Sequence, residues 1–385
     1  MLVLNVVLAI AFTGTQSTSF IEQITSTMKR DPAQAESLIR QKFSPADLTV
    51  GISPYKEGVN VLFAVDAGKG RHQVSVSGDN LRPVKFFPVG DLYVGVAQFE
   101  PEQGTTAYYS IDEKKSPKIF NIETYKPNPL VDGPPGGRKG ELRDMGEWKS
   151  TIFAGTTRKW FIYLPPNFDP NHEYPVLIGT DAQWDRQWQA NALENCAREK
   201  LIPPTVGVFI EPGQDKPGNY SFRSHEYDRL SGDYSSFLLS EILPQVEKII
   251  KLSQDPSQRA CVGVSSGGIC GFTSCWQHPE SFSAVISGVG SFDDIAHGES
   301  FKEGGHNYPF MVRLSDKKPI RAFLQDGDHD IDNEFGNWFL GNEQMAKALK
   351  FKGYDINWNP GHGFHSSDHL RSIFDKALVW WNGMR

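Results

Sequence analysis

The spacing of apolar residues changes along the chain, and each kind of spacing predicts a different kind of element. Residues 20–45 carry apolar side chains at helical intervals, and Asp31 followed by Pro32 is typical of a helix start. Between residues 46 and 125, short runs such as VNVLFAV and LYVGVAQF alternate with Gly, Asp, Asn and Pro. Closely spaced short strands of this kind predict a small Ig-like β-sandwich.

A stretch rich in proline and glycine, residues 126–142, separates this region from the rest of the chain. Such a composition favours a linker. The chain has 385 residues, more than one hydrophobic core usually holds, so two domains are expected. We therefore predict a β-sandwich domain over residues 46–125 and a second domain over residues 143–385.

Continuous apolar runs alternate with amphipathic stretches in the second domain. The runs predict strands at 159–165, 174–181, 205–212, 259–265, 283–290, 319–327 and 354–360. The amphipathic stretches predict helices at 235–251, 269–277, 342–352 and 366–382. Strands that are apolar on both faces and separated by helices indicate a mostly parallel sheet covered on both sides, which is the α/β class.

An apolar run over residues 2–12 is followed by small polar residues. The run is too short to span a bilayer, but it fits the hydrophobic part of a signal peptide. We expect residues 1–19 to be a signal peptide and the protein to be exported, either to the periplasm or out of the cell. The alternative is a buried N-terminal helix in a cytoplasmic protein. We expect no integral membrane segment in the mature chain, because no other segment reaches membrane-spanning length.

The charge balance argues against one class of partner. The chain has 39 Lys and Arg against 46 Asp and Glu, a net charge of −7, and no basic stripe that could follow a phosphate backbone. We therefore expect no nucleic-acid partner. The four cysteines form no C-x-x-C pair, and we expect small buried side chains rather than disulfides.

The stretch Gly263–Gly267, GVSSG, matches the G-x-S-x-G pattern of a nucleophile elbow. A predicted strand precedes it and a predicted helix follows, which is the context that this motif needs. Ser265 occupies the nucleophile position, with Ser266 as the alternative. In such a turn the backbone N–H of the residue after the nucleophile helps to hold an oxyanion, so Ser266 is the expected donor.

A serine nucleophile needs a base, and the base needs an orienting acid. In this motif's fold the acid and then the base follow the serine, each at a strand end. The acidic loop after residues 319–327 and the His-rich loop before residues 366–382 meet that order. The candidates are Asp326, Asp328, Asp330, Asp332, His362, His365 and His369. Neither an EF-hand nor an H-E-x-x-H motif is present, so we expect no metal and no organic cofactor.

From residue 148 to residue 381 the chain resembles the enterochelin-esterase-like, or esterase D, branch of the α/β-hydrolase superfamily. The motifs that carry the resemblance are FIYLPPNFDPNHEYPVLIGTDAQW, RSHEYD, GVSSGGICGF, LQDGDHDIDNEFGNW and GFHSSDH. The resemblance implies an α/β-hydrolase domain, and enterochelin esterases carry a β-sandwich before it. It further implies Asp330, three residues after Gly327, as the acid, and His365, the first histidine of H-x-x-x-H, as the base.

The resemblance also implies that the loop after residues 174–181 donates backbone N–H groups to the oxyanion, from Ala182 and Gln183. Many relatives have Asp-Gly where this chain has Asp181 and Ala182. We expect three nearby side chains to shape the substrate pocket: Trp184, Arg223 and Glu226. Arg223 suits an anionic or polyhydroxylated acyl group. A structural Arg–Glu pair in the pocket wall is the alternative.

Together these features predict a serine esterase that forms an acyl-enzyme on a small-molecule or carbohydrate ester. The resemblance allows a siderophore trilactone as the substrate, or acetyl and feruloyl esters of carbohydrates. The alternative of another class is a non-catalytic glycan-binding protein built on a hydrolase scaffold.

Overall fold

The structure is a computed structural model, and it describes residues 19–78, 81–100, 104–116, 118, 120–122, 125–133, 139–296 and 303–383. By its internal contacts the chain divides into a smaller N-terminal unit, which ends at Phe120, and a larger unit, mainly Asn121–Arg385. Residues 1–18 of the expected signal peptide lie outside the described residues. In the described part, we find no helix with both the length and the apolar character needed to cross a membrane.

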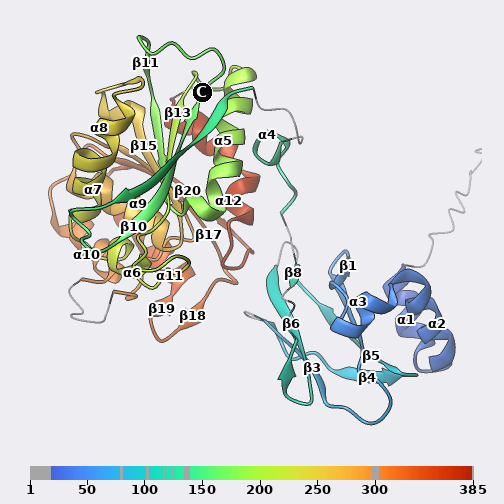
Figure 1. Ribbon diagram of the computed structural model, residues 1–385. Coiled ribbons are helices and arrows are strands. Elements are labelled where there is room, and N and C mark those ends of the chain that lie inside the picture. The colour runs from blue at the N-terminus through green and yellow to red at the C-terminus, as the bar shows by residue number, and fades with distance from the viewer. Residues whose placement is uncertain are drawn as a thin grey trace, which may run out of the picture. The chain divides into compact units, whose positions relative to one another are not determined.

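The smaller unit combines short helices with two sheets (Figure 1). The Asp31 side chain accepts the N–H of Gln34 at 3.0 Å, which confirms the predicted helix start. The strand orders are β1-β2-β5-β4 and β3-β6-β7, with β8 beside β6. The bounds are α1 (Phe20–Thr27), α2 (Pro32–Lys42), α3 (Pro45–Val50), β1 (Tyr55–Glu57), β2 (Asn60–Asp66), β3 (Val74–Ser77), β4 (Phe86–Val89), β5 (Leu92–Gln98), β6 (Thr105–Ile111), β7 (Lys114–Lys115) and β8 (Phe120–Ile122).

An eight-stranded sheet forms the centre of the larger unit, in the order β20-β17-β16-β15-β12-β13-β10-β9. The six strands from β20 to β13 are parallel, and β10 and β9 run antiparallel at one edge. The mostly parallel sheet predicted from the apolar runs is thereby confirmed. The bounds are β9 (Glu141–Lys149), β10 (Thr157–Leu164), β12 (Val176–Gly179), β13 (Val206–Ile210), β15 (Arg259–Val264), β16 (Ala284–Gly288), β17 (Arg321–Gly327) and β20 (Asp355–Gly361).

Helices cover both faces of this sheet (Figure 1). Alternate residues of a strand point to opposite faces, so Ile162 belongs to one buried core while Phe161 and Tyr163 belong to the other. The helices on the first face are α6 (Arg223–Tyr227), α7 (Asp233–Phe237), α8 (Leu243–Val246), α9 (Ser266–Gln277), α10 (Tyr308–Leu314) and α11 (Trp338–Phe351); those on the second are α4 (Pro129–Asp132), α5 (Ala182–Arg198), α12 (Asp368–Ser372) and α13 (Phe374–Trp381).

Four of these helices, α4, α5, α6 and α10, were not predicted from the apolar pattern. Helix α5 spans 17 residues, and its sequence is rich in Gln, Asn and Ala, so its apolar stripe is weak. Helix α4 lies inside the stretch predicted to be a linker, and Val131 is fully buried against the second core. Part of the Pro-rich stretch is thus packed structure, because Asn128 and Pro129 begin a helical turn.

The topology brings several loops to one edge of the sheet. Strand β15 lies between β12 and β16, and β17 and β20 continue the parallel set. Parallel strands end at the same edge, so the turns after β12, β15, β17 and β20 leave the sheet together. This edge, at the carboxyl ends of the strands, is where open α/β sheets bind ligands.

Candidate active site

Ser265 lies at a sharp turn between β15 and α9. Its backbone has φ 60° and ψ −127°, a conformation that costs a residue with a side chain roughly 1–3 kcal/mol. Two glycines permit the close packing around it. A Cβ on Gly263 would lie 2.2 Å from backbone atoms of Gly267, and a Cβ on Gly267 would lie 2.2 Å from Oγ1 of Thr180. The strand before the turn and the helix after it confirm the context predicted from G-x-S-x-G.

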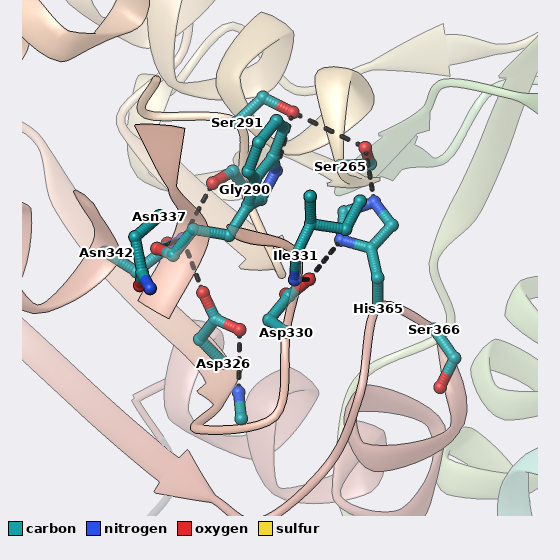
Figure 2. A network of polar contacts seen from close by, with 12 residues as sticks. Ser265, Gly290, Ser291, Asp326, Asp330, Ile331, Asn337, Asn342, His365 and Ser366 are labelled. Atoms are coloured by element: carbon teal, nitrogen blue, oxygen red, sulfur yellow. Dashed lines mark hydrogen bonds and ion pairs between the residues drawn. The ribbon is translucent and has the colours of Figure 1, made fainter. Parts of the chain in front are cut away.

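Figure 2 shows a continuous chain of polar contacts that starts at this serine. Nε2 of His365 lies 2.8 Å from Oγ of Ser265, and Nδ1 of His365 lies 2.6 Å from Oδ1 of Asp330. The N–H of Ile331 also donates to Oδ1 of Asp330, at 2.6 Å. Asp330 is buried, whereas Ser265 and His365 are half-buried. An imidazole held between a hydroxyl and a carboxylate in this way can accept the serine proton while the carboxylate fixes its tautomer.

The other candidate histidines have different neighbours. The ring of His369 stacks on Tyr125 at 4.1 Å, and its Nδ1 lies 2.9 Å from Nε2 of Gln325. Burial lowers the pKa of His369 to about 4, so this imidazole is neutral near pH 7. His362 is exposed, and its Nδ1 lies 2.9 Å from Oδ2 of Asp328. The three histidines are therefore not gathered around a common point.

The other candidate acids and the second serine also lie apart from His365. Asp332 is exposed in a short hairpin of β18 (Asp332–Asn333) and β19 (Gly336–Asn337). Ser266 is only 2% exposed, and the buried Asp228 carboxyl lies near its side chain. Of the two serines in the turn, Ser265 is the one whose hydroxyl contacts an imidazole in the described structure.

Two helices begin at the sheet edge that carries Ser265. Ser266 begins α9, and Ala182 and Gln183 begin α5. The two helices start side by side because β12 and β15 are paired in parallel, with Gly179 opposite Val262. The first N–H groups of a helix have no acceptor within that helix, so they are suited to an oxyanion.

The departure from Asp-Gly at residues 181 and 182 has a simple structural account. Asp181 takes the left-handed conformation, with φ 53°, and Ala182 is the first residue of α5. The left-handed backbone conformation therefore belongs to Asp181 and not to Ala182. The methyl group of Ala182 meets no backbone conflict. The change to Ala182 leaves its N–H at the start of α5.

Arg223 holds this loop in place. Its Nε and Nη2 donate to Oδ1 and Oδ2 of Asp181, both at 2.7 Å, and Nη2 also lies 3.4 Å from the carbonyl oxygen of Val264. The guanidinium therefore links the residue before Ala182 to the residue before Ser265. Its side chain is 19% exposed, so most of its hydrogen-bonding capacity is used within the protein. Trp184, in contrast, is 60% exposed at the start of α5.

The sequence suggested an ion pair between Glu226 and Arg223, but Glu226 pairs with a different arginine. Its carboxylate accepts from Nη1 and Nη2 of Arg158, at 2.8 and 2.9 Å, and from the N–H of Gly213 at 3.0 Å. Both charged side chains are 0% exposed. Glu226 is thus the buried partner of Arg158, and we expect no contact between its carboxylate and a substrate.

Replacing Glu226 with alanine is expected to lower the free energy of unfolding by about 3–5 kcal/mol, because Arg158 would be left buried without its counter-ion. Urea denaturation would measure the loss, with Glu173→Ala as the control, since Glu173 is exposed. A variant with unchanged stability and a raised KM would instead give Glu226 a role in binding substrate.

Two further residues contact the Ser265–His365 pair. Oγ of Ser291 lies 3.4 Å from Oγ of Ser265 and accepts from Nε1 of Trp338 at 3.2 Å, and the Trp338 ring lies edge-on to that of His365 with centroids 5.8 Å apart. The sequence analysis did not find these two residues. No motif marks Ser291, which follows a predicted strand. Trp338 is one of nine tryptophans, and nothing in the sequence distinguishes it as a neighbour of the histidine.

One group of side chains in the described structure is close enough to share a metal ion: Asp328, His329 and His362. The Asp328 carboxylate contacts Nδ1 of both imidazoles, at 2.7 and 2.9 Å. These hydrogen bonds account for the proximity of the three residues without an ion, and we assign no metal to them.

Comparison with known proteins gives the family of the chain. The sequence model of the family described as "Putative esterase" matches residues 150–379, which include Ser265, Asp330 and His365. The chain belongs to this esterase family. The matched residues span most of the larger unit and include the sheet edge described above.

Relatives of the esterase agree with the resemblance seen in its motifs. An iron(III) enterobactin esterase from Dickeya dadantii is 24% identical over 247 residues, which cover 61% of this chain and 53% of that protein. The crystal structure of enterochelin esterase from Shigella flexneri matches with a TM-score of 0.66 and 16% identity, over 86% of this chain and 95% of that one. A ferulic acid esterase from Anaeromyces mucronatus, in complex with ferulic acid, matches with a TM-score of 0.51 and 17% identity, over 67% and 96%. These matches confirm the predicted fold.

Proposed function

We propose that the protein is a serine esterase that works through an acyl-enzyme, with Ser265 as nucleophile, His365 as base and Asp330 as the orienting acid. The observation that carries the proposal is the unbroken hydrogen-bonded chain from Oγ of Ser265 through both ring nitrogens of His365 to Asp330. Membership of the esterase family supports the same chemistry. A glycan-binding protein without catalysis would have no need of this alignment.

In the proposed first step, Oγ of Ser265 bonds to the ester carbonyl carbon while Nε2 of His365 takes the hydroxyl proton. The carbonyl oxygen becomes an oxyanion held by the N–H groups of Ser266, Ala182 and Gln183. When the intermediate collapses, the alcohol leaves with the proton from His365, and the acyl group stays on Ser265. Water then repeats the sequence with His365 as base, which releases the acid and restores the serine.

Replacing Asp330 with asparagine is expected to lower kcat by about 10⁴-fold, because an amide group cannot hold the required tautomer of His365 or stabilise its cation. Steady-state kinetics on a p-nitrophenyl ester would measure the loss. Asp332→Asn is the matched control in the same loop, since Asp332 is exposed and apart from His365. A mild effect at residue 330 with a severe one at residue 332 would assign the acid to Asp332.

For the substrate, we propose a siderophore trilactone with aromatic acyl-amide arms. The match to enterochelin esterase supports this choice, because it extends over 86% of the chain. Trp184 supports an aromatic ligand: it is 60% exposed beside the expected oxyanion loop, and its ring lies 5.9 Å from that of Tyr220. An exposed tryptophan beside a half-buried tyrosine offers stacking surface to a planar ring.

Feruloyl esters of carbohydrates are the second candidate, supported by the structural match to a ferulic acid esterase. A panel assay on the purified protein would separate the two, with a catecholate trilactone, methyl ferulate, an acetylated xylan and simple p-nitrophenyl esters as substrates. The highest kcat/KM is expected for the trilactone. A higher value for methyl ferulate would select the second candidate, and no hydrolysis of any ester would refute the proposed enzyme.

A further inference from the structure

A second carboxyl group lies behind the proposed acid. Asp326 is near the end of β17, four residues before Asp330, and it is 0% exposed. The Asp326 and Asp330 carboxyl groups are close enough to interact directly, and Figure 2 shows them side by side. The mechanism above makes no use of Asp326.

Two adjacent buried carboxyl groups are not both ionised, because burial and their mutual repulsion both oppose the second charge. Asp330 already accepts hydrogen bonds from His365 and from the N–H of Ile331 on one oxygen, so it is the acceptor of the pair. The shared proton therefore belongs on Asp326. Burial, and after it the charge of Asp330, raises the pKa of Asp326 well above its ordinary value. Asp293 is the other carboxyl near this pair, and burial followed by the charge of Asp330 raises its pKa to about 7.

The Asp326 side chain is held rigidly on its remaining sides. Its Oδ1 accepts the N–H of Gly327 at 2.6 Å, and its Oδ2 accepts from Nδ2 of Asn342 at 2.7 Å. The same Nδ2 of Asn342, also 0% exposed, donates to the carbonyl oxygen of Gly290 at 2.7 Å. Gly290 precedes Ser291, whose hydroxyl contacts Ser265. Asp326 thus connects the acid to the segment beside the nucleophile (Figure 2).

We propose that Asp326 is a positioning residue, a neutral carboxylic acid that donates a hydrogen bond to Asp330 and so keeps Oδ1 of Asp330 directed at His365. The inference rests on the proposed function. A rigid partner behind Asp330 matters because Asp330 works by holding one orientation of the His365 imidazole. Removing a residue that supports a catalytic residue in this way typically lowers activity by about 10- to 100-fold.

Three variants test the role of Asp326. Asp326→Ala removes the donor, and kcat is expected to fall by about 10- to 100-fold while KM changes less than about threefold. Asp326→Asn keeps a neutral donor of the same shape, so it is expected to recover most of that loss. Asp332→Asn, in the exposed hairpin, controls for removing a carboxyl group from this loop. The pH at which kcat/KM is half-maximal on the acid side is expected to be the same in Asp326→Asn and the wild type, because no charge is removed.

Infrared difference spectroscopy tests the protonation state without reference to catalysis. At pH 7 the wild type minus Asp326→Asn spectrum is expected to contain the C=O band of a protonated carboxylic acid. Any one of three results would overturn the inference. They are a carboxylate band in place of the C=O band, an acid-side midpoint of kcat/KM lowered by half a pH unit or more in Asp326→Asn, and full kcat in Asp326→Ala. If Asp326→Ala does not fold, the infrared band and the pH profile of Asp326→Asn decide it. Failure of the proposed function would show differently, as full activity in Asp330→Asn or no ester hydrolysis by the wild type.

Discussion

Ser265→Ala is expected to lower kcat by about 10⁶-fold, the scale of loss seen when the nucleophile of a serine hydrolase is removed. Neither of the two neighbouring serines is placed to replace it. The Ser266 side chain is buried. Ser291 is 3.4 Å from Oγ of Ser265, but no contact joins its hydroxyl to His365 in the described structure. The measurement is kcat on the best ester of the panel, with circular dichroism to verify folding.

Labelling with a fluorophosphonate, followed by peptide mapping, gives an independent readout of the nucleophile. The adduct is expected on Ser265 in the wild type and to be absent from Ser265→Ala. Ser266→Ala is expected to be labelled still, because alanine keeps the backbone N–H at the start of α9. An adduct on Ser266 would reject the assignment.

His365→Ala is expected to cause a loss of similar size, about 10⁶-fold in kcat, because removing the base disables the nucleophile as completely as removing the nucleophile itself. The only imidazole within hydrogen-bonding distance of Ser265 in the described structure is that of His365. His362→Ala is the matched control: it removes an exposed imidazole from the same connection, one bonded to Asp328.

The ratio of kcat between these two variants decides the assignment of the base. A near-normal kcat in His362→Ala and a collapsed one in His365→Ala are expected. A substantial kcat in His365→Ala, together with a collapse in His362→Ala, would move the base to the exposed position and reject the proposed site.

Local patterns in the sequence determined the class of fold and the position of the turn at Ser265. Apolar runs such as 205–212 and 259–265 predict strands because a strand buried on both faces must be apolar throughout, and β13 and β15 lie there. The elbow was predictable for the same reason: a strand, three glycines around two serines and a helix are all neighbours in sequence. Helix α5 was not, because Gln, Asn and Ala give its buried face a weak apolar signal.

Only the tertiary structure decided which side chains meet. Four aspartates lie between residues 326 and 332, and their spacing alone does not say which one contacts His365; the family resemblance pointed to Asp330. The contact follows from the parallel pairing of β17 and β20, which sets Gly327 opposite Gly361 and so aligns the two loops that follow. Asp330 then faces His365, while Asp326 turns inward to Asn342 and Asp332 lies in an exposed hairpin.

The partners of the charged side chains were decided in the same way. Arg223 and Glu226 are three residues apart in one short helix, which suggests a pair, yet Arg223 bonds Asp181 and Glu226 bonds Arg158. Each partner comes from another strand or strand end of the sheet. A sequence pattern describes the periodicity of residues within one segment. A hydrogen bond between segments depends on the distance between them, and that distance is set only by the order and register of the strands.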